Sequence, residues 1–207
     1  MAITADAIKQ LRETSGAGIM EVKKALVETG GDTEKALKVL RERGLAKAAK
    51  LATREAKEGL ICSYIHHSGR VGVLVEVNCV TDFVARTEEF GALCRDIAMH
   101  IAAANPQWIR KEDVSQEALQ REIEVYKTQA RNEGKPEKIL DKIAEGKLNK
   151  FYTDNCLIEQ PFIRDEEKTV GGMISEYAAK TGENIVVSRF VRFALGEGAP
   201  GAEEAQA

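Results

Sequence analysis

Three strand-like segments with uneven spacing constrain the fold of this chain most. Residues 60–66 and 71–78 are rich in apolar and β-branched residues and flank a turn at residues 67–70, a pattern typical of a β-hairpin. A third segment, residues 185–193, comes about a hundred residues later and alternates apolar with polar side chains over its second half. Because helical patterns fill the interval, we predict a small antiparallel sheet covered by helices, which is the α+β class.

The N-terminal part predicts a small module of three short helices. Residues 3–44 contain breaks at Ser15-Gly16-Ala17-Gly18 and at Gly30-Gly31, and Gly44 is expected to end the third helix, because glycine is favoured just past helix C-termini. Residues 45–57 are polar and rich in alanine, lysine and arginine, which indicates a helix or a linker.

A helical hairpin is predicted in the middle of the chain. Its first arm has an apolar seam with spacings of four, three and four residues, as in a short coiled coil, formed by Leu119, Ile123, Tyr126 and Ala130. The turn falls at residues 132–136, and Ile139 and Ile143 are expected to start the return arm. Residues 170–180 predict one further helix.

These patterns predict four parts along the chain. They are a three-helix module at residues 1–45, a helical linker at 46–57, an α+β core at 58–195 with the helical hairpin at about 115–150, and a tail at 196–207. The tail has no apolar pattern and is expected to be disordered.

The segment Thr81-Asp82-Phe83-Val84 lies where the second strand-like run ends and a helical run begins. Thr81 is a favoured N-cap residue, and Asp82 would then lie at the positive end of the helix dipole. Phe83 falls seven residues before Phe90, which is the first residue of the apolar face of that helix. Two interpretations stay open: one more core phenylalanine in a capped helix, or an acid and an aromatic presented together at an exposed helix tip.

Composition and charge argue against several classes of protein. Hydrophobic residues make up 43% and charged residues 30% of the chain, as in soluble globular proteins. The N-terminus lacks a signal-peptide pattern, and no run approaches the roughly 18 apolar residues of a membrane span, so we expect a cytoplasmic protein with no membrane partner. The net charge of -3 argues against direct nucleic-acid binding. The four cysteines show no C-x-x-C spacing and indicate buried thiols.

The sequence shows no arrangement of catalytic groups. The glycine-containing segment at residues 15–18 does not match a phosphate-binding loop, and no strand precedes it. His66 and His67 are adjacent, so in a strand their side chains would point to opposite faces and could not share a metal ion. We therefore expect no catalytic residue, no metal site and no cofactor.

Several motifs resemble those of one known family, bacterial translation elongation factor Ts. The most specific is EVNCVTDFVAR at residues 76–86, followed by IKQLR at 8–12, TSGAGIM at 14–20 and KKAL at 23–26. The strings GKP at 134–136, QPF at 160–162 and GENI at 182–185 also fit, so the resemblance extends from about residue 3 to residue 195.

The resemblance implies a guanine-nucleotide exchange factor for the GTPase elongation factor Tu, and not an enzyme. It implies an N-terminal module similar to a ubiquitin-associated domain, an α+β core and a coiled-coil hairpin. The residues that would enter the partner's G domain and displace the elements holding its Mg²⁺ are Thr81, Asp82, Phe83 and Val84. Those that would grip the G domain are Lys9, Arg12, Ile19 and Met20.

The chain departs from longer family members, which carry a second copy of the core fold. It has room for about one copy and resembles the short form, so we expect a homodimer that joins two core sheets. The last strand contains Val191 and no cysteine, and the dimer is therefore expected to be non-covalent.

Other functions stay open at this point. A helical protein-binding adaptor without exchange activity would use the same N-terminal module. An RNA-binding accessory of the ribosome would use the basic residues Lys47, Lys50, Arg54 and Lys57. A hydrolase lacks any set of residues to test.

Overall fold

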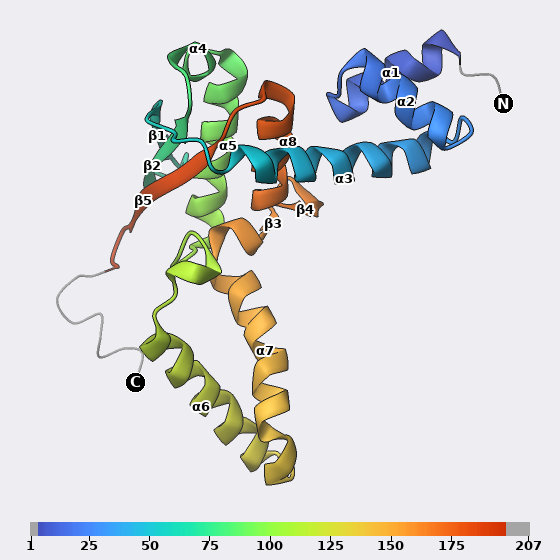
Figure 1. Cartoon of the computed structure of the whole chain (residues 1–207). Coiled ribbons are helices and arrows are strands. Elements are labelled where there is room, and N and C mark those ends of the chain that lie inside the picture. The colour runs from blue at the N-terminus through green and yellow to red at the C-terminus, as the bar shows by residue number, and fades with distance from the viewer. Residues whose placement is uncertain (1–3, 198–207) are drawn as a thin grey trace. The chain divides into compact units, whose positions relative to one another are not determined.

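The computed structural model describes residues 4–197, so the predicted disordered tail lies almost entirely outside the described residues. Helices combine with a small sheet, which confirms the α+β class (Figure 1). The helices are α1 (Ala5–Ser15), α2 (Ile19–Glu28), α3 (Thr33–Leu51), α4 (Asp82–Ala85), α5 (Glu88–Ala104), α6 (Gln116–Asn132), α7 (Leu140–Asn155) and α8 (Val170–Thr181). The strands are β1 (Glu58–Ile65), β2 (Val71–Cys79), β3 (Pro161–Phe162), β4 (Asp165–Thr169) and β5 (Val186–Ala194).

The chain forms two compact units, each assembled from separate segments. The first unit contains residues 4–60, 77–91 and 172–186, and the second contains residues 61–76, 92–171 and 187–197. The division into four parts expected from the sequence stays a prediction, because compactness does not show which part folds alone.

Three helices of the first unit pack around a small apolar core. Gly16 ends α1 with a φ of 65°, which confirms the first predicted break. The buried residues of this core are Leu11, Val22, Ala25, Leu26, Ala36 and Leu40. The predicted stop at Gly44 is wrong, because α3 continues to Leu51. Gly44 instead faces α8, where a Cβ at this position would lie 3.5 Å from the Cβ of Ala179.

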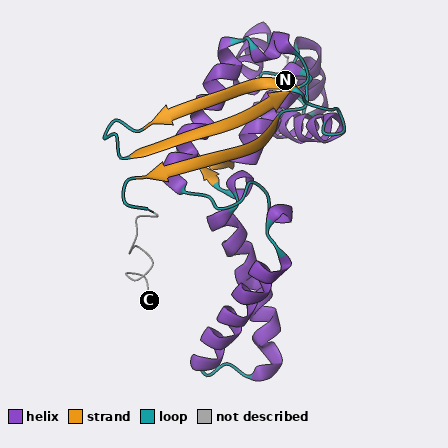
Figure 2. Ribbon diagram, turned by 90° about the vertical axis from the view of Figure 1, so that its left-hand side faces the viewer, coloured by secondary structure: helices purple, strands orange, loops and turns teal. Residues whose placement is uncertain are grey.

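The predicted β-hairpin is confirmed as β1 and β2, and β5 pairs with the other edge of β2. Figure 2 shows the three arrows alternating in direction, as in an antiparallel sheet. Along β2 the residues Val73 and Val75 are buried and Leu74 between them is exposed, so one face of the sheet packs inward. Arg192 of β5 donates to the carbonyl oxygen of Ala102 in α5 at 3.2 Å, so α5 packs against the sheet.

The run after β2 forms two helices, so the prediction of one capped helix is wrong. Thr81 caps only α4, and the hydroxyl of Thr87 accepts a hydrogen bond from the Phe90 N–H at 3.2 Å at the start of α5. This second cap accepts a hydrogen bond from a backbone N–H group that has no partner within α5. The chain can therefore turn between α4 and α5. The predicted apolar face of α5 is confirmed, since Phe90, Leu93, Cys94, Ile97, Ala98 and Ile101 are all buried.

The second unit contains the predicted helical hairpin. Helices α6 and α7 pair, and Ala130 and Ala144 are buried on them. Ile139 does not begin the return arm: it lies exposed in a short 3₁₀ turn, and Leu140 is buried at the start of α7. Sequence analysis missed the hairpin of β3 and β4, because strands of two and five residues are too short to show an alternating pattern.

Candidate functional site

Phe83 is the most exposed large apolar side chain in the described part of the protein, with 80% of its surface accessible. The interpretation as one more core phenylalanine is therefore wrong. The structure instead places Phe83 and the acidic Asp82 on the short helix α4. A lone exposed apolar residue is ordinary on a protein surface, so the distinguishing feature of Phe83 is how firmly its backbone is held.

The N-terminal side of this tip is held by a carboxylate from a distant segment. Oε2 of Glu183 accepts hydrogen bonds from the backbone N–H groups of Val80 and Thr81, both at 3.1 Å, and Oε1 accepts from the hydroxyl of Thr81. The same hydroxyl accepts from the N–H of Val84 at 3.4 Å and so caps α4. Glu183, in the turn between α8 and β5, therefore binds the backbone before Phe83 directly and the N–H after it only through the hydroxyl of Thr81.

The C-terminal side of the tip is anchored through α8. The hydroxyl of Thr87 donates to the carbonyl oxygen of Val84 at 2.8 Å and lies 3.3 Å from the hydroxyl of Tyr177. The ring of Tyr177 lies 6.1 Å from the ring of the buried Phe90, measured between centroids. Asp82 forms an exposed ion pair with Arg86 at 2.8 Å, which contributes little to stability because water screens it.

A buried thiol lies directly beneath the tip. The Sγ of Cys79 donates to the carbonyl oxygen of Thr81 at 3.2 Å. Burial, together with the smaller effect of the negative charge of Glu183, raises the pKa of this thiol to about 11. Cys79 is therefore protonated at neutral pH and serves as a packing residue rather than a nucleophile.

The four residues predicted to grip a partner are all exposed on the three-helix module. Lys9 and Arg12 lie on α1, whereas Ile19 and Met20 lie at the start of α2 with 55% and 63% of their surfaces accessible. Sequence analysis missed Val27, which is also exposed on α2. A shallow groove of about 270 Å³ is lined by Met20, Lys23, Lys24, Val27 and Glu28. The spacing of Met20, Lys23, Lys24 and Val27 on one helical face was visible in the sequence.

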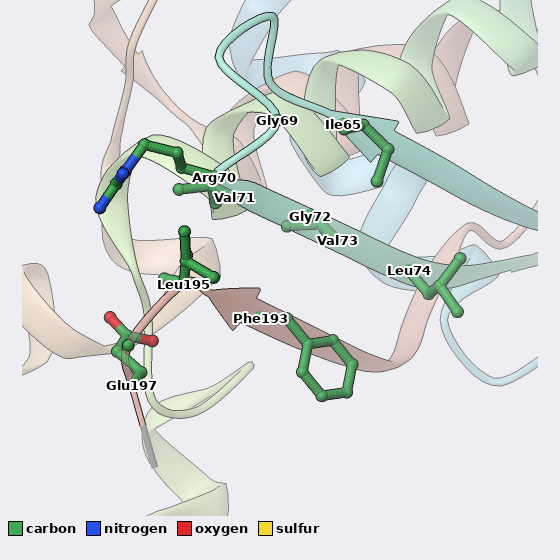
Figure 3. Close-up of a pocket in the computed structure, with 12 residues that line it drawn as sticks. Ile65, Gly69, Arg70, Val71, Gly72, Val73, Leu74, Phe193, Leu195 and Glu197 are labelled. Carbon is green, nitrogen blue, oxygen red and sulfur yellow. The ribbon is translucent and has the colours of Figure 1, made fainter. Parts of the chain in front are cut away.

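In the second unit one face of the sheet carries exposed apolar side chains. Figure 3 shows Ile65 on β1, Leu74 on β2 and Phe193 on β5, beside a concave region of about 660 Å³ that Leu195 also lines. Gly72 lies between them, and a Cβ there would come within 2.9 Å of the Cδ1 of Ile65. Ile65, Leu74 and Phe193 have 66%, 49% and 69% of their surfaces accessible, so this face of the sheet is exposed within its unit.

His66 and His67 follow the end of β1 at Ile65, so the argument from strand geometry does not apply to them, and their ring centroids lie 4.1 Å apart. Within residues 4–197, no group of three or more His, Cys, Asp or Glu side chains is placed to hold a metal ion. In the same range, no helix is both long and apolar enough to cross a membrane.

Comparison with known proteins gives a consistent result. The family described as elongation factor TS matches residues 2–197. Elongation factor Ts of Thermosipho melanesiensis is 59% identical over 195 residues, which cover 94% of this chain and 100% of that protein. Elongation factor Ts of Caldanaerobacter subterraneus subsp. tengcongensis is 60% identical over 196 residues, which cover 95% of this chain and 98% of that protein. Elongation factor Ts of Heliobacterium modesticaldum is 60% identical over 196 residues, covering 95% and 91% of the two chains.

Proposed function

The chain belongs to the elongation factor Ts family, and from this premise we propose that it promotes GDP release from elongation factor Tu by inserting the α4 tip into the G domain. The observation that carries this proposal is the exposed Phe83 on a backbone held from both sides. Phe83 enters an apolar site between elements of the partner. Thr81, Asp82 and Val84 displace the groups that hold the Mg²⁺ ion there.

The free-energy balance of such a mechanism is reasonable. A GTPase holds GDP partly through Mg²⁺, which bridges protein groups and phosphate oxygens. Burial of one phenylalanine stabilises a complex by roughly 1.5–3 kcal/mol. If only a deformed nucleotide site accepts Phe83, the free energy of Phe83 burial favours the state that binds GDP weakly. Each ~1.4 kcal/mol of this coupling weakens nucleotide binding tenfold. The coupling is reciprocal, so bound nucleotide weakens the exchange factor by the same factor.

The three-helix module provides affinity for the G domain. Ile19 and Met20 offer exposed apolar surface, and Lys9 and Arg12 add positive charge on α1. The groove along α2 with the exposed Val27 extends this surface. An exchange factor of this kind makes or breaks no covalent bond and needs no catalytic residue, metal or cofactor of its own. The proposed setting is the cytoplasm, with no direct contact to nucleic acid.

The open sheet face supports a non-covalent homodimer. Ile65, Leu74 and Phe193 form an apolar surface that a second copy of the same sheet would cover, at the roughly 10 Å spacing of packed sheets. Val191, also exposed on β5, offers no thiol for a covalent link. A monomer mass in light scattering at micromolar concentration would rule this dimer out.

The direct test is the release of a fluorescent GDP analogue from elongation factor Tu. The wild-type protein is expected to accelerate release, and Phe83→Ala is expected to lower the maximal rate much more than the affinity. Ile163→Ala is the matched control, because it also removes an exposed apolar side chain but outside the proposed contact surfaces. If a folded wild-type protein does not accelerate release, the alternative of a helical protein-binding adaptor takes precedence. Unchanged exchange by Phe83→Ala would show that another segment acts on the nucleotide site.

A further inference from the structure

Glu183 is a buried carboxylate whose described hydrogen bonds all go to the base of the α4 tip. It lies in the turn between α8 and β5 with 9% of its surface accessible. Its two oxygens accept from the N–H groups of Val80 and Thr81 and from the hydroxyl of Thr81. We propose that Glu183 is a positioning residue, which holds Phe83 in the orientation that enters the partner. This inference rests on the proposed exchange function.

The α4 tip depends on such support because it is too short to be stable alone. Isolated helices shorter than about 12–15 residues are marginal in water, and α4 has four residues. Phe83 is largely surrounded by water, so its own side chain does little to fix the backbone. The orientation of its ring must therefore come from the residues on either side.

Glu183 controls the direction of the capping hydroxyl. A hydroxyl has one proton to donate and two lone pairs to accept with, whereas an ionised carboxylate only accepts. Because Thr81 donates its proton to Glu183, its lone pairs remain for the N–H of Val84. The carboxylate thus acts on Phe83 through Thr81, and it orders the first turn of α4 without touching the partner.

The neighbouring Asn184 lies in the same turn as Glu183 but binds a different segment of the first unit. The side-chain amide of Asn184 donates to the carbonyl oxygens of Ala52 at 3.3 Å and Arg54 at 2.7 Å, just after the end of α3. It is as buried as Glu183, with 9% of its surface accessible. Asn184 therefore provides a matched control that disturbs the same turn but not the tip.

The test measures nucleotide release over a range of exchange-factor concentrations. Glu183→Ala is expected to lower the maximal rate about five- to tenfold, as the loss of an ordered N-cap lowers the population of the competent tip. The half-saturating concentration is expected to change less than about twofold, because the gripping module is intact. Asn184→Ala is expected to lower the maximal rate by less than about twofold.

A double mutant separates positioning from general stability. Combined with Phe83→Ala, Glu183→Ala is expected to add almost no further loss, because both act through the same side chain. A further full loss on that background, or a wild-type maximal rate for Glu183→Ala alone, would overturn the inference. If Phe83→Ala abolishes exchange while Glu183→Ala does not, the proposed function stands and only this inference fails.

A second readout works without the partner and reports the local order of the tip in variants whose other amides remain rigid. In ¹⁵N relaxation of the free protein, Glu183→Ala is expected to lower the order parameter of the Phe83 amide from about 0.85 toward 0.6, whereas Asn184→Ala is not. Glu183→Gln keeps the side-chain size, exchanges one acceptor for a donor, and is expected to give an intermediate value. An unchanged Phe83 amide in both Glu183 variants would refute the positioning role, whatever the exchange assay shows.

Discussion

The Nε2 atom of His100 lies 2.9 Å from Oε1 of Gln160 in the interior of the second unit. The N–H of Ile163 donates to the other ring nitrogen, Nδ1, at 3.4 Å, so Nε2 carries the proton of a neutral imidazole and donates to Gln160. Burial lowers the pKa of His100 below its usual 6.5, although the bond to Gln160 opposes this shift. The core of this unit therefore contains a histidine that is stable in its neutral form.

The first prediction is that acid weakens the second unit through His100. Since the folded pKa is lowered, the unfolded chain binds more protons below pH 6.5, and stability falls as the pH decreases through that value. One such group contributes a slope of at most about 1.4 kcal/mol per pH unit. Urea unfolding at pH 7.5 and 5.5 is expected to show a smaller pH difference for His100→Gln than for the wild type. Equal differences would mean that other groups cause the acid sensitivity.

The second prediction concerns the open sheet face. Phe193→Asp is expected to give a monomer, because burying an unpaired charge in a packed apolar interface is strongly unfavourable. Val125→Asp serves as a control, because it puts a charge on an exposed apolar position of α6, which is not part of the sheet, and it should change the mass less. Sedimentation of both variants at micromolar concentration distinguishes the outcomes. A Phe193→Asp protein that stays dimeric would place the interface elsewhere.

The third prediction is that the cysteines react in a fixed order. Burial raises the pKa values of Cys79 and Cys156 to about 11, so few thiolates form at pH 8, and Cys62 is the least buried of the four thiols. A thiol reagent is expected to label Cys62 first in the native protein, and Cys79 and Cys156 only upon unfolding. Mass mapping of the modified peptides checks this order, and rapid labelling of Cys79 would show that the tip opens readily.

The fourth prediction compares two glycines. Gly59 in β1 has a φ of 149°, and a Cβ there would lie 2.2 Å from the carbonyl oxygen of Val77. Gly59→Ala is therefore expected to destabilise the protein by about 3 kcal/mol or more. Gly146→Ala in α7 meets no atom within 4 Å and should stabilise it by about 0.5–1 kcal/mol, because alanine favours helices. Denaturant midpoints of the two variants should move in opposite directions.

Local signals explain the parts of the fold that sequence analysis predicted correctly. The breaks around Gly16 and Gly30, the β1–β2 hairpin and the apolar face of α5 each follow from residues close together in the chain. The errors have local causes too. Gly44 satisfied the rule for a helix stop, but the residues that follow it are strong helix formers rich in alanine and lysine, and α3 continues to Leu51. Thr87 caps a second helix, α5. Sequence analysis missed this cap because the apolar register is continuous across it.

The α+β class, the family and the position of the motif around Phe83 could be predicted before any coordinates, because they depend on periodicity and on short strings of residues. The exposure of Phe83, the hydrogen bonds of Glu183 to Val80 and Thr81, and the exposed apolar face of the sheet became visible only in the folded chain. Thr81 and Glu183 are 102 residues apart, and no periodicity or spacing links them. Helix caps and periodicity act within a few residues, so they could be predicted from the sequence. Burial and long-range hydrogen bonds depend on the packing of the whole chain, so they could not.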